Sequence, residues 1–181
     1  RLLVPNSRMD EAIAAASAAA ASVTVGDPAG DVAMGPVVSK SQYNIIQEYI
    51  ENGLADGVSK LIAGGLGRPE GLDKGWFVKP TVFVTTNDTV IGREEIFGPV
   101  LVMIGYDDID HAVEIANDSN FGLAGYVDGL DQEVCRSVAR RLRAGRVWIN
   151  EHHMHSAAAP FGGYKQSGNG TELGTYGLSE Y

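Results

Sequence analysis

Two adjacent carboxylates and an aromatic ring stand directly before an apolar run in this chain. Glu94, Glu95 and Phe97 are followed by a Gly-Pro pair, and residues 100–104 read Val-Leu-Val-Met-Ile. The apolar run predicts a buried strand, and loops at strand ends are where α/β proteins place ligand-contacting groups. A carboxylate can accept hydrogen bonds from sugar hydroxyls, and a ring can pack against a flat heterocycle. Because adjacent side chains in an extended segment point apart, we expect one carboxylate to face a ligand and the other to face solvent.

A second dense motif runs from Pro160 to Gly168, where glycines surround two rings. It predicts a tightly folded loop in which Phe161 forms the apolar wall of a binding cleft. The histidines His152, His153 and His155 precede it. A metal site needs ligands from separate elements with supporting partners, and no cysteine or matching carboxylate spacing accompanies these histidines. We therefore predict a surface or pocket-lining role for the histidine loop, and no metal.

Two other motifs favour structural interpretations. The single cysteine, Cys135, falls in an expected helix over 131–144, beside its apolar stripe. A buried thiol is a poor nucleophile, so we predict a structural role for it. The glycines at 64, 65 and 67 lack G-x-G-x-x-G spacing and are followed by Arg-Pro instead of a helix. They are interpreted as a flexible turn between strands.

Composition excludes several classes of function. The net charge of −9 argues against a nucleic-acid partner, because phosphate binding needs clustered Lys and Arg. No run approaches the ~20 apolar residues of a membrane span, and no signal peptide begins the chain. A single cysteine gives no disulfide framework, so we expect a cytoplasmic protein. Arg1 is not a natural start residue, and the chain is expected to be a piece of something longer.

The elements that must position these residues alternate between helical and strand-like patterns, which predicts an α/β fold built on a parallel sheet. Ser39 begins a capping box, and Gly145 is expected to close the helix before it. Helices are expected over 9–22, 39–51, 108–117, 131–144 and 171–181, and strands over 60–63, 80–84, 100–104, 121–127 and 146–150.

Four segments, together with Trp148-Ile149-Asn150, occur in the order found in aldehyde dehydrogenases, which this chain resembles along its whole length. They are Leu2–Pro5, Gly35–Val38, Glu94–Pro99 and Pro160–Gly168. The resemblance implies a three-layer, parallel-sheet catalytic domain that is incomplete. Residues 1–181 would be a partial catalytic domain. The dinucleotide-binding domain, the nucleophile segment and the final oligomerisation strand would be absent from it.

The resemblance also implies roles in binding NAD or NADP. Glu95 would hold the hydroxyls of the nicotinamide-side ribose, and Phe97 would pack near the nicotinamide. Gln42 falls in a helix that would help to frame the cofactor.

On the substrate side, the resemblance implies that Phe161 and the loop over 151–159, with His153 and His155, line the tunnel for a small-molecule aldehyde. The histidines depart from the aromatic residues often found in this loop, which leaves the substrate preference open.

The implied activity is oxidation of an aldehyde to a carboxylic acid through a cysteine thiohemiacetal and thioester, in a protein that forms homo-oligomers when intact. The nucleophilic cysteine and the general-base glutamate are expected upstream, so we predict no catalytic residue here and an inactive isolated chain. Two alternatives stay open. One is an acylating, coenzyme A-dependent family member. The other is a stand-alone, non-catalytic binding or assembly module of the same fold, whose unpaired sheet edge recruits another chain.

Overall fold

The computed structural model describes every residue of the chain except 153, 155 and 181. It comprises two compact units, residues 1–107 and residues 108–181. None of the helices in this described part of the chain is long and apolar enough to cross a membrane.

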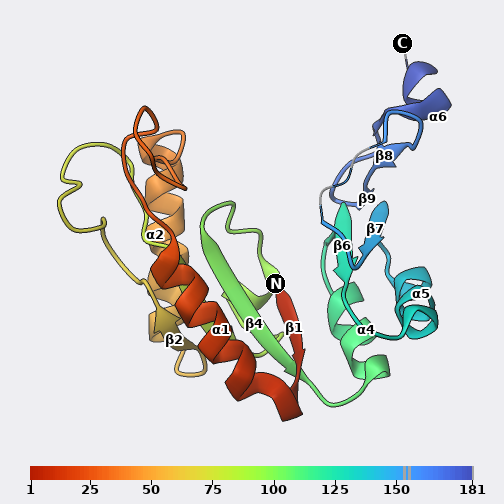
Figure 1. Ribbon diagram of the computed structural model, residues 1–181, viewed down its shortest axis with the longest axis horizontal. Helices are drawn as coiled ribbons and strands as arrows, with labels where there is room; N and C mark the ends of the chain where they lie inside the picture. The colour runs from red at the N-terminus through yellow and green to blue at the C-terminus, as the bar shows by residue number, and fades with distance from the viewer. Residues whose placement is uncertain (153, 155, 181) are drawn as a thin grey trace. The chain divides into compact units, whose positions relative to one another are not determined.

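The first unit is built on a four-stranded sheet with the strand order β1-β4-β3-β2 (Figure 1). The parallel α/β sheet expected from the sequence is confirmed for β1, β4 and β3, and β2 adds an antiparallel edge. The elements of this unit are β1 (Leu2–Pro5), the short 3-10 helix η1 (Asn6–Arg8), α1 (Met9–Ser22), α2 (Lys40–Ala55), β2 (Lys60–Ala63), β3 (Thr81–Thr85), α3 (Val90–Arg93) and β4 (Val100–Tyr106).

The antiparallel pairing of β2 follows from its connection to β3. A parallel neighbour needs a crossover, usually a helix, whereas residues 64–80 contain none. The glycines at 64, 65 and 67 all have positive φ, which confirms a turn between strands. At Gly64, a Cβ would lie 2.5 Å from the Thr81 hydroxyl oxygen, so only glycine allows the chain to approach β3 this closely.

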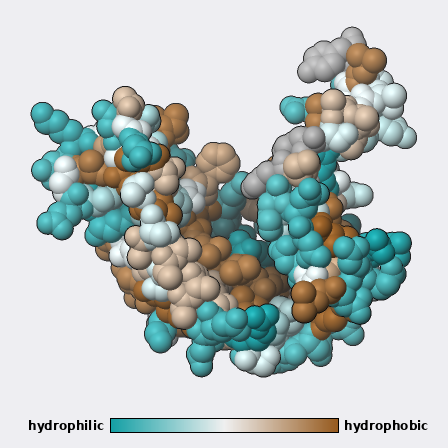
Figure 2. All heavy atoms as spheres, viewed as in Figure 1, coloured by the Kyte–Doolittle hydropathy of each residue, from teal (hydrophilic) through white to brown (hydrophobic). Residues whose placement is uncertain are grey.

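Helix α1 packs on the sheet through small side chains. Val4, Val82 and Met103 form a buried cluster, which residues of α1 cover, among them Met9, Ala12, Ile13, Ala16 and Ala20. No residue of α1 is itself fully buried. In Figure 2 the helix shows a pale brown alanine face, beside darker apolar side chains.

Helix α2 begins as its capping box predicts, because the Ser39 side chain accepts a hydrogen bond from the Gln42 backbone N–H at 3.2 Å. Ile46 and Ile50 are fully buried. The helix continues four residues beyond the predicted end at 51, to Ala55. Gly53 lies in that extension, where a Cβ would approach Ile91 Cδ1 to 2.7 Å, so the last turn packs tightly against α3.

The second unit contains short strand pairs and three helices within residues 108–180. Strands β6 and β7 pair in parallel, whereas the pairs β5–β9 and β8–β10 are antiparallel. Its elements are α4 (Ile109–Asn117), β5 (Phe121–Gly122), β6 (Ala124–Val127), α5 (Gln132–Arg141), β7 (Arg146–Ile149), β8 (Phe161–Gly162), β9 (Tyr164–Lys165), β10 (Thr171–Glu172) and α6 (Gly174–Leu178).

The predicted end of the helix over 131–144 was wrong. Helix α5 ends at Arg141, because the Asn117 side chain forms hydrogen bonds with backbone groups on both sides of the helix end. Its Nδ2 donates to the Arg141 carbonyl at 2.9 Å, and its Oδ1 accepts from the Arg143 N–H at 2.7 Å. Gly145 therefore does not close the helix. It lies where a Cβ would collide with the carbonyl oxygen of Gly162, so its role is close approach of two segments.

Two other predicted elements are shorter than expected. The strand over 121–127 is split into β5 and β6, which pair with different partners. The helix expected over 171–181 is reduced to α6, because residues 171–172 pair with β8 instead.

Candidate functional site: an exposed carboxylate–aromatic loop and a glycine-rich hollow

The loop from Glu94 to Pro99 joins the short helix α3 to the central strand β4. The Glu94 backbone N–H donates to the Val90 carbonyl at 3.0 Å, and its extended backbone ends α3. Glu94 and Glu95 are both exposed, whereas Ile96 is buried at 7% exposure. The loop is therefore anchored by its apolar residue and presents its carboxylates outward.

Helix α2 contacts this loop through two residues one turn apart, Gln42 and Ile46. Gln42 Nε2 donates to the carbonyl oxygen of Ile96 at 3.3 Å and to that of Phe97 at 3.0 Å. One turn along, Ile46 packs so closely on Gly98 that a Cβ there would lie 2.5 Å from Ile46 Cδ1. The polar end of Gln42 is thus engaged with the protein backbone. Its predicted role in framing a cofactor stays a prediction.

Phe97 is held in an unusual conformation. Its φ is +54°, in the left-handed region that bulky residues avoid, and its side chain is 75% exposed. Such a conformation costs about 1–3 kcal/mol and persists only where the surroundings impose it, typically at ligand clamps and active sites. The two hydrogen bonds from Gln42 supply part of that constraint. The result is a fixed loop that offers an acceptor carboxylate and a bare ring.

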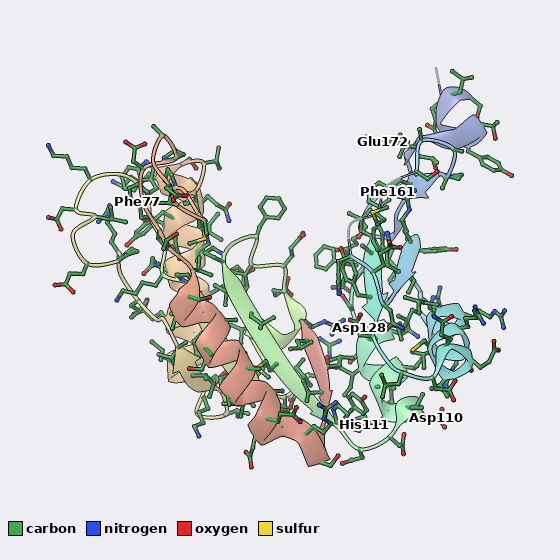
Figure 3. All side chains as sticks on the ribbon, viewed as in Figure 1. Phe77, Asp110, His111, Asp128, Phe161 and Glu172 are labelled. Atoms are coloured by element: carbon green, nitrogen blue, oxygen red, sulfur yellow. The ribbon has the colours of Figure 1, made fainter. Side chains whose placement is uncertain are left out.

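Phe161 lies in the second unit, on β8, and its Cα pairs with that of Glu172 on β10 (Figure 3). A hollow of about 520 Å³ opens beside it. The hollow is lined by Leu123, Phe161, Gly162, Gly163, Ser167, Gly170, Thr171, Glu172 and Glu180. An open hollow thus lies at the glycine-rich motif, with the half-buried Phe161 ring on its wall, and its use as a binding cleft stays a prediction.

Glu172 was not predicted as a site residue, because it lies eleven residues after Phe161 and outside the glycine-rich motif that ends at Gly168. Only the pairing of β8 with β10 brings this exposed carboxylate to the hollow. A periodic pattern could not have revealed it, because the two strands have only two residues each.

The loop before this motif is described only in part. His153 and His155, which the sequence analysis placed in a substrate tunnel, lie outside the described residues. His152 is exposed and stacks on Tyr126, with ring centroids 4.9 Å apart. Its Nε2 lies 3.5 Å from Asp128 Oδ1. Among residues 1–152, 154 and 156–180, no group of three His, Cys, Asp or Glu side chains could hold a metal ion.

Cys135 is only 3% exposed and lies on α5. Its sulfur packs against Gly129, where a Cβ would approach it to 2.8 Å. The predicted burial is correct. A thiol enclosed in this way has little access to a substrate, which is consistent with the structural role predicted for it.

Comparison with known proteins places these features in a family. The model of the aldehyde dehydrogenase family matches residues 1–181. A relative from Staphylococcus haemolyticus, whose name assigns it to the aldehyde dehydrogenases, is 46% identical over 183 residues. The match covers 100% of this chain and 38% of that protein. The chain thus spans well under half the length of the curated relatives it matches.

Solved structures agree. Aldehyde dehydrogenase AldC of Pseudomonas syringae, a C291A mutant in complex with NAD+ and octanal, has a TM-score of 0.95 and 46% identity, covering 99% of this chain and 37% of that one. An aldehyde dehydrogenase of Mycobacterium tuberculosis in complex with NAD+ has a TM-score of 0.94 and 43% identity, covering 98% and 37%. From its sequence and its fold, the chain belongs to the aldehyde dehydrogenase family.

Proposed function

We propose that this chain works as part of an NAD(P)-dependent aldehyde dehydrogenase, as the C-terminal part of its catalytic domain. The observation that carries the proposal is the loop over 94–99. It matches a family whose solved members bind NAD+, and it is held rigidly while Glu95 and Phe97 are left exposed.

The residues present fit a nicotinamide nucleoside. The Glu95 carboxylate is exposed, and as a hydrogen-bond acceptor it suits the two hydroxyls of a ribose. The Phe97 ring offers a flat apolar face to a heterocycle. Gln42 acts through the backbone of the loop, by fixing the carbonyls on either side of the bend at Phe97. The cofactor, when bound, supplies the hydride acceptor, and these residues orient it.

The hollow beside Phe161 is proposed to admit the aldehyde. Its lining joins the half-buried Phe161 ring and Leu123 to a glycine-rich rim and two carboxylates, Glu172 and Glu180, and the apolar part suits the hydrocarbon portion of an aldehyde. An octanal complex of the related Pseudomonas syringae enzyme supports an aldehyde as the ligand class. We also propose that His153 and His155 belong to this wall.

The 181 residues alone are proposed to be inactive. Aldehyde oxidation in this family requires a cysteine thiolate, and the single cysteine of this chain is enclosed in α5. We further propose that the intact enzyme is cytoplasmic and homo-oligomeric, for which the family membership is the support.

The test is aldehyde-dependent reduction of NAD or NADP, followed by the absorbance of the reduced nicotinamide. The intact enzyme and the purified 181-residue chain are assayed side by side with a series of straight-chain aldehydes. We expect turnover by the intact enzyme and none by the chain alone. Turnover by the chain alone, lost on treatment with a thiol reagent, would contradict the proposal, as would an intact enzyme that reduces neither cofactor.

A further inference from the structure

One face of strand β7 carries two large side chains that reach the segment leading to Phe161. Strand alternation places Arg146 and Trp148 on the same face. Trp148 is buried and stacks on Tyr126 of the neighbouring strand, with centroids 5.0 Å apart and planes 12° from parallel. The Arg146 guanidinium carbon lies 5.6 Å from the Trp148 ring centroid and 5.0 Å from that of Phe161. The guanidinium therefore contacts both rings.

The side chains of Arg146 and Trp148 also donate hydrogen bonds to backbone carbonyls that precede Phe161. Arg146 Nη2 donates to the carbonyl oxygen of Ala159 at 2.7 Å and to that of Pro160 at 2.9 Å. Trp148 Nε1 donates to the Met154 carbonyl at 2.8 Å. The carbonyls of Met154, Ala159 and Pro160 are thus hydrogen-bonded to side chains of a single strand, and Phe161 directly follows Pro160.

Arginine suits this position for a physical reason. Its planar guanidinium can contact rings through its faces while its N–H groups donate in the plane. Lysine has a rotating, compact ammonium group that cannot do both at once. These contacts of Arg146 lie within the second unit, at the Phe161 wall.

We propose that Arg146 and Trp148 are positioning residues for the aldehyde: they hold the backbone at Met154, Ala159 and Pro160 and the ring of Phe161, and so set which aldehydes the hollow admits. This inference rests on the proposed function, in which Phe161 lines the aldehyde site. Neither residue takes part in the chemistry, and neither orients the cofactor. Their loss is therefore expected to change KM for the aldehyde and to leave kcat and KM for NAD nearly unchanged.

The experiment compares Arg146→Lys with Arg143→Lys in the intact enzyme. Arg143 lies three residues earlier and is exposed, and it contacts Asn117 through its backbone N–H, so the same substitution there is a matched control. We expect Arg146→Lys to raise KM for medium-chain aldehydes roughly tenfold, the scale of a lost hydrogen bond to a charged group. An unchanged aldehyde KM, or an equal rise in the KM for NAD, would overturn the inference.

A second variant keeps the test decisive if Arg146→Lys does not fold, and a double-mutant cycle sharpens it if that variant folds. Trp148→Phe retains an aromatic ring and removes the donor to Met154, and we expect a several-fold rise in aldehyde KM. Arg146→Lys combined with Phe161→Ala should cost less than the sum of the two single changes, because the first acts through the second. Additive effects would contradict positioning. An intact enzyme without any aldehyde oxidation would instead refute the proposed function, whereas normal oxidation with unaltered specificity in these variants refutes only this inference.

Discussion

Replacing Gly98 with alanine tests how helix α2 positions the loop over 94–99. The added Cβ would lie 2.5 Å from Cδ1 and 2.7 Å from Cγ1 of Ile46. Two carbon atoms in contact prefer a separation of about 3.5–4.0 Å, so the loop or the helix must shift by roughly 1 Å. Ile46 is fully buried and cannot move aside, and the loop is therefore expected to move outward.

The magnitude follows from that overlap. Overpacking of a well-packed site costs about 1–3 kcal/mol. If NAD binding requires the original geometry of the loop, this strain is subtracted from the free energy of binding. The affinity for NAD then falls between about fivefold and 150-fold. The shift also moves the Phe97 carbonyl away from Gln42 Nε2, which now donates to it at 3.0 Å.

The assay is NAD affinity of the intact enzyme by quenching of protein fluorescence, with thermal unfolding measured on the same samples. Gly35→Ala is the matched control, because Gly35 also precedes a proline and its Cβ would meet only Pro28, at an ordinary 3.5 Å. We expect Gly98→Ala to weaken NAD binding and Gly35→Ala to leave it unchanged.

A further substitution, Ile46→Val, removes the Cδ1 atom and should restore part of the affinity lost in Gly98→Ala. Equal NAD affinity for wild type and Gly98→Ala would refute the reasoning. The reasoning would also be refuted if Ile46→Val lowered the NAD affinity of Gly98→Ala by as much as it lowers that of the wild type. The contact between residues 46 and 98 would then not be the cause of the loss.

Three other changes follow from the same contacts. Gln42→Met removes the donor to two carbonyls of the loop over 94–99. It should raise KM for NAD about fivefold in steady-state kinetics with little change in kcat, and an unchanged KM would contradict this. Cys135→Ser should keep kcat and lower stability by about 1–3 kcal/mol in denaturant unfolding, because a hydroxyl replaces a buried thiol; loss of activity in folded enzyme would show a catalytic role. Gly145→Ala should push away the Gly162 carbonyl and lower the unfolding temperature, and full stability would refute the close approach.

Local patterns predicted the elements that local physics determines. The capping serine at 39 predicts a helix start and the apolar run over 100–104 predicts a strand, each from a few neighbouring residues, and both are confirmed. The exposed pair of carboxylates beside Phe97 was also visible in the sequence, since its loop lies between two locally predicted segments.

Features that depend on distant residues could not be predicted in this way. The early end of α5 depends on Asn117, more than twenty residues away, which takes hydrogen bonds that the helix would otherwise need. The positive φ of Phe97 depends on Gln42, 55 residues away. The contact of Arg146 with Phe161 depends on how β7 meets the glycine-rich segment. Periodicity carries no information about such pairs.

The central claim is that Glu95, and not its neighbour Glu94, holds the nicotinamide-side ribose. The measurement that tests it most directly is NAD affinity of the intact enzyme with Glu95→Gln and with Glu94→Gln. Both residues are exposed and adjacent, so each variant is the control for the other. A hydrogen bond to a charged group contributes about 1.5–3 kcal/mol, which predicts a loss of affinity of roughly tenfold or more for Glu95→Gln. Glu94→Gln should bind NAD as the wild type does, and equal losses in the two variants would contradict the claim.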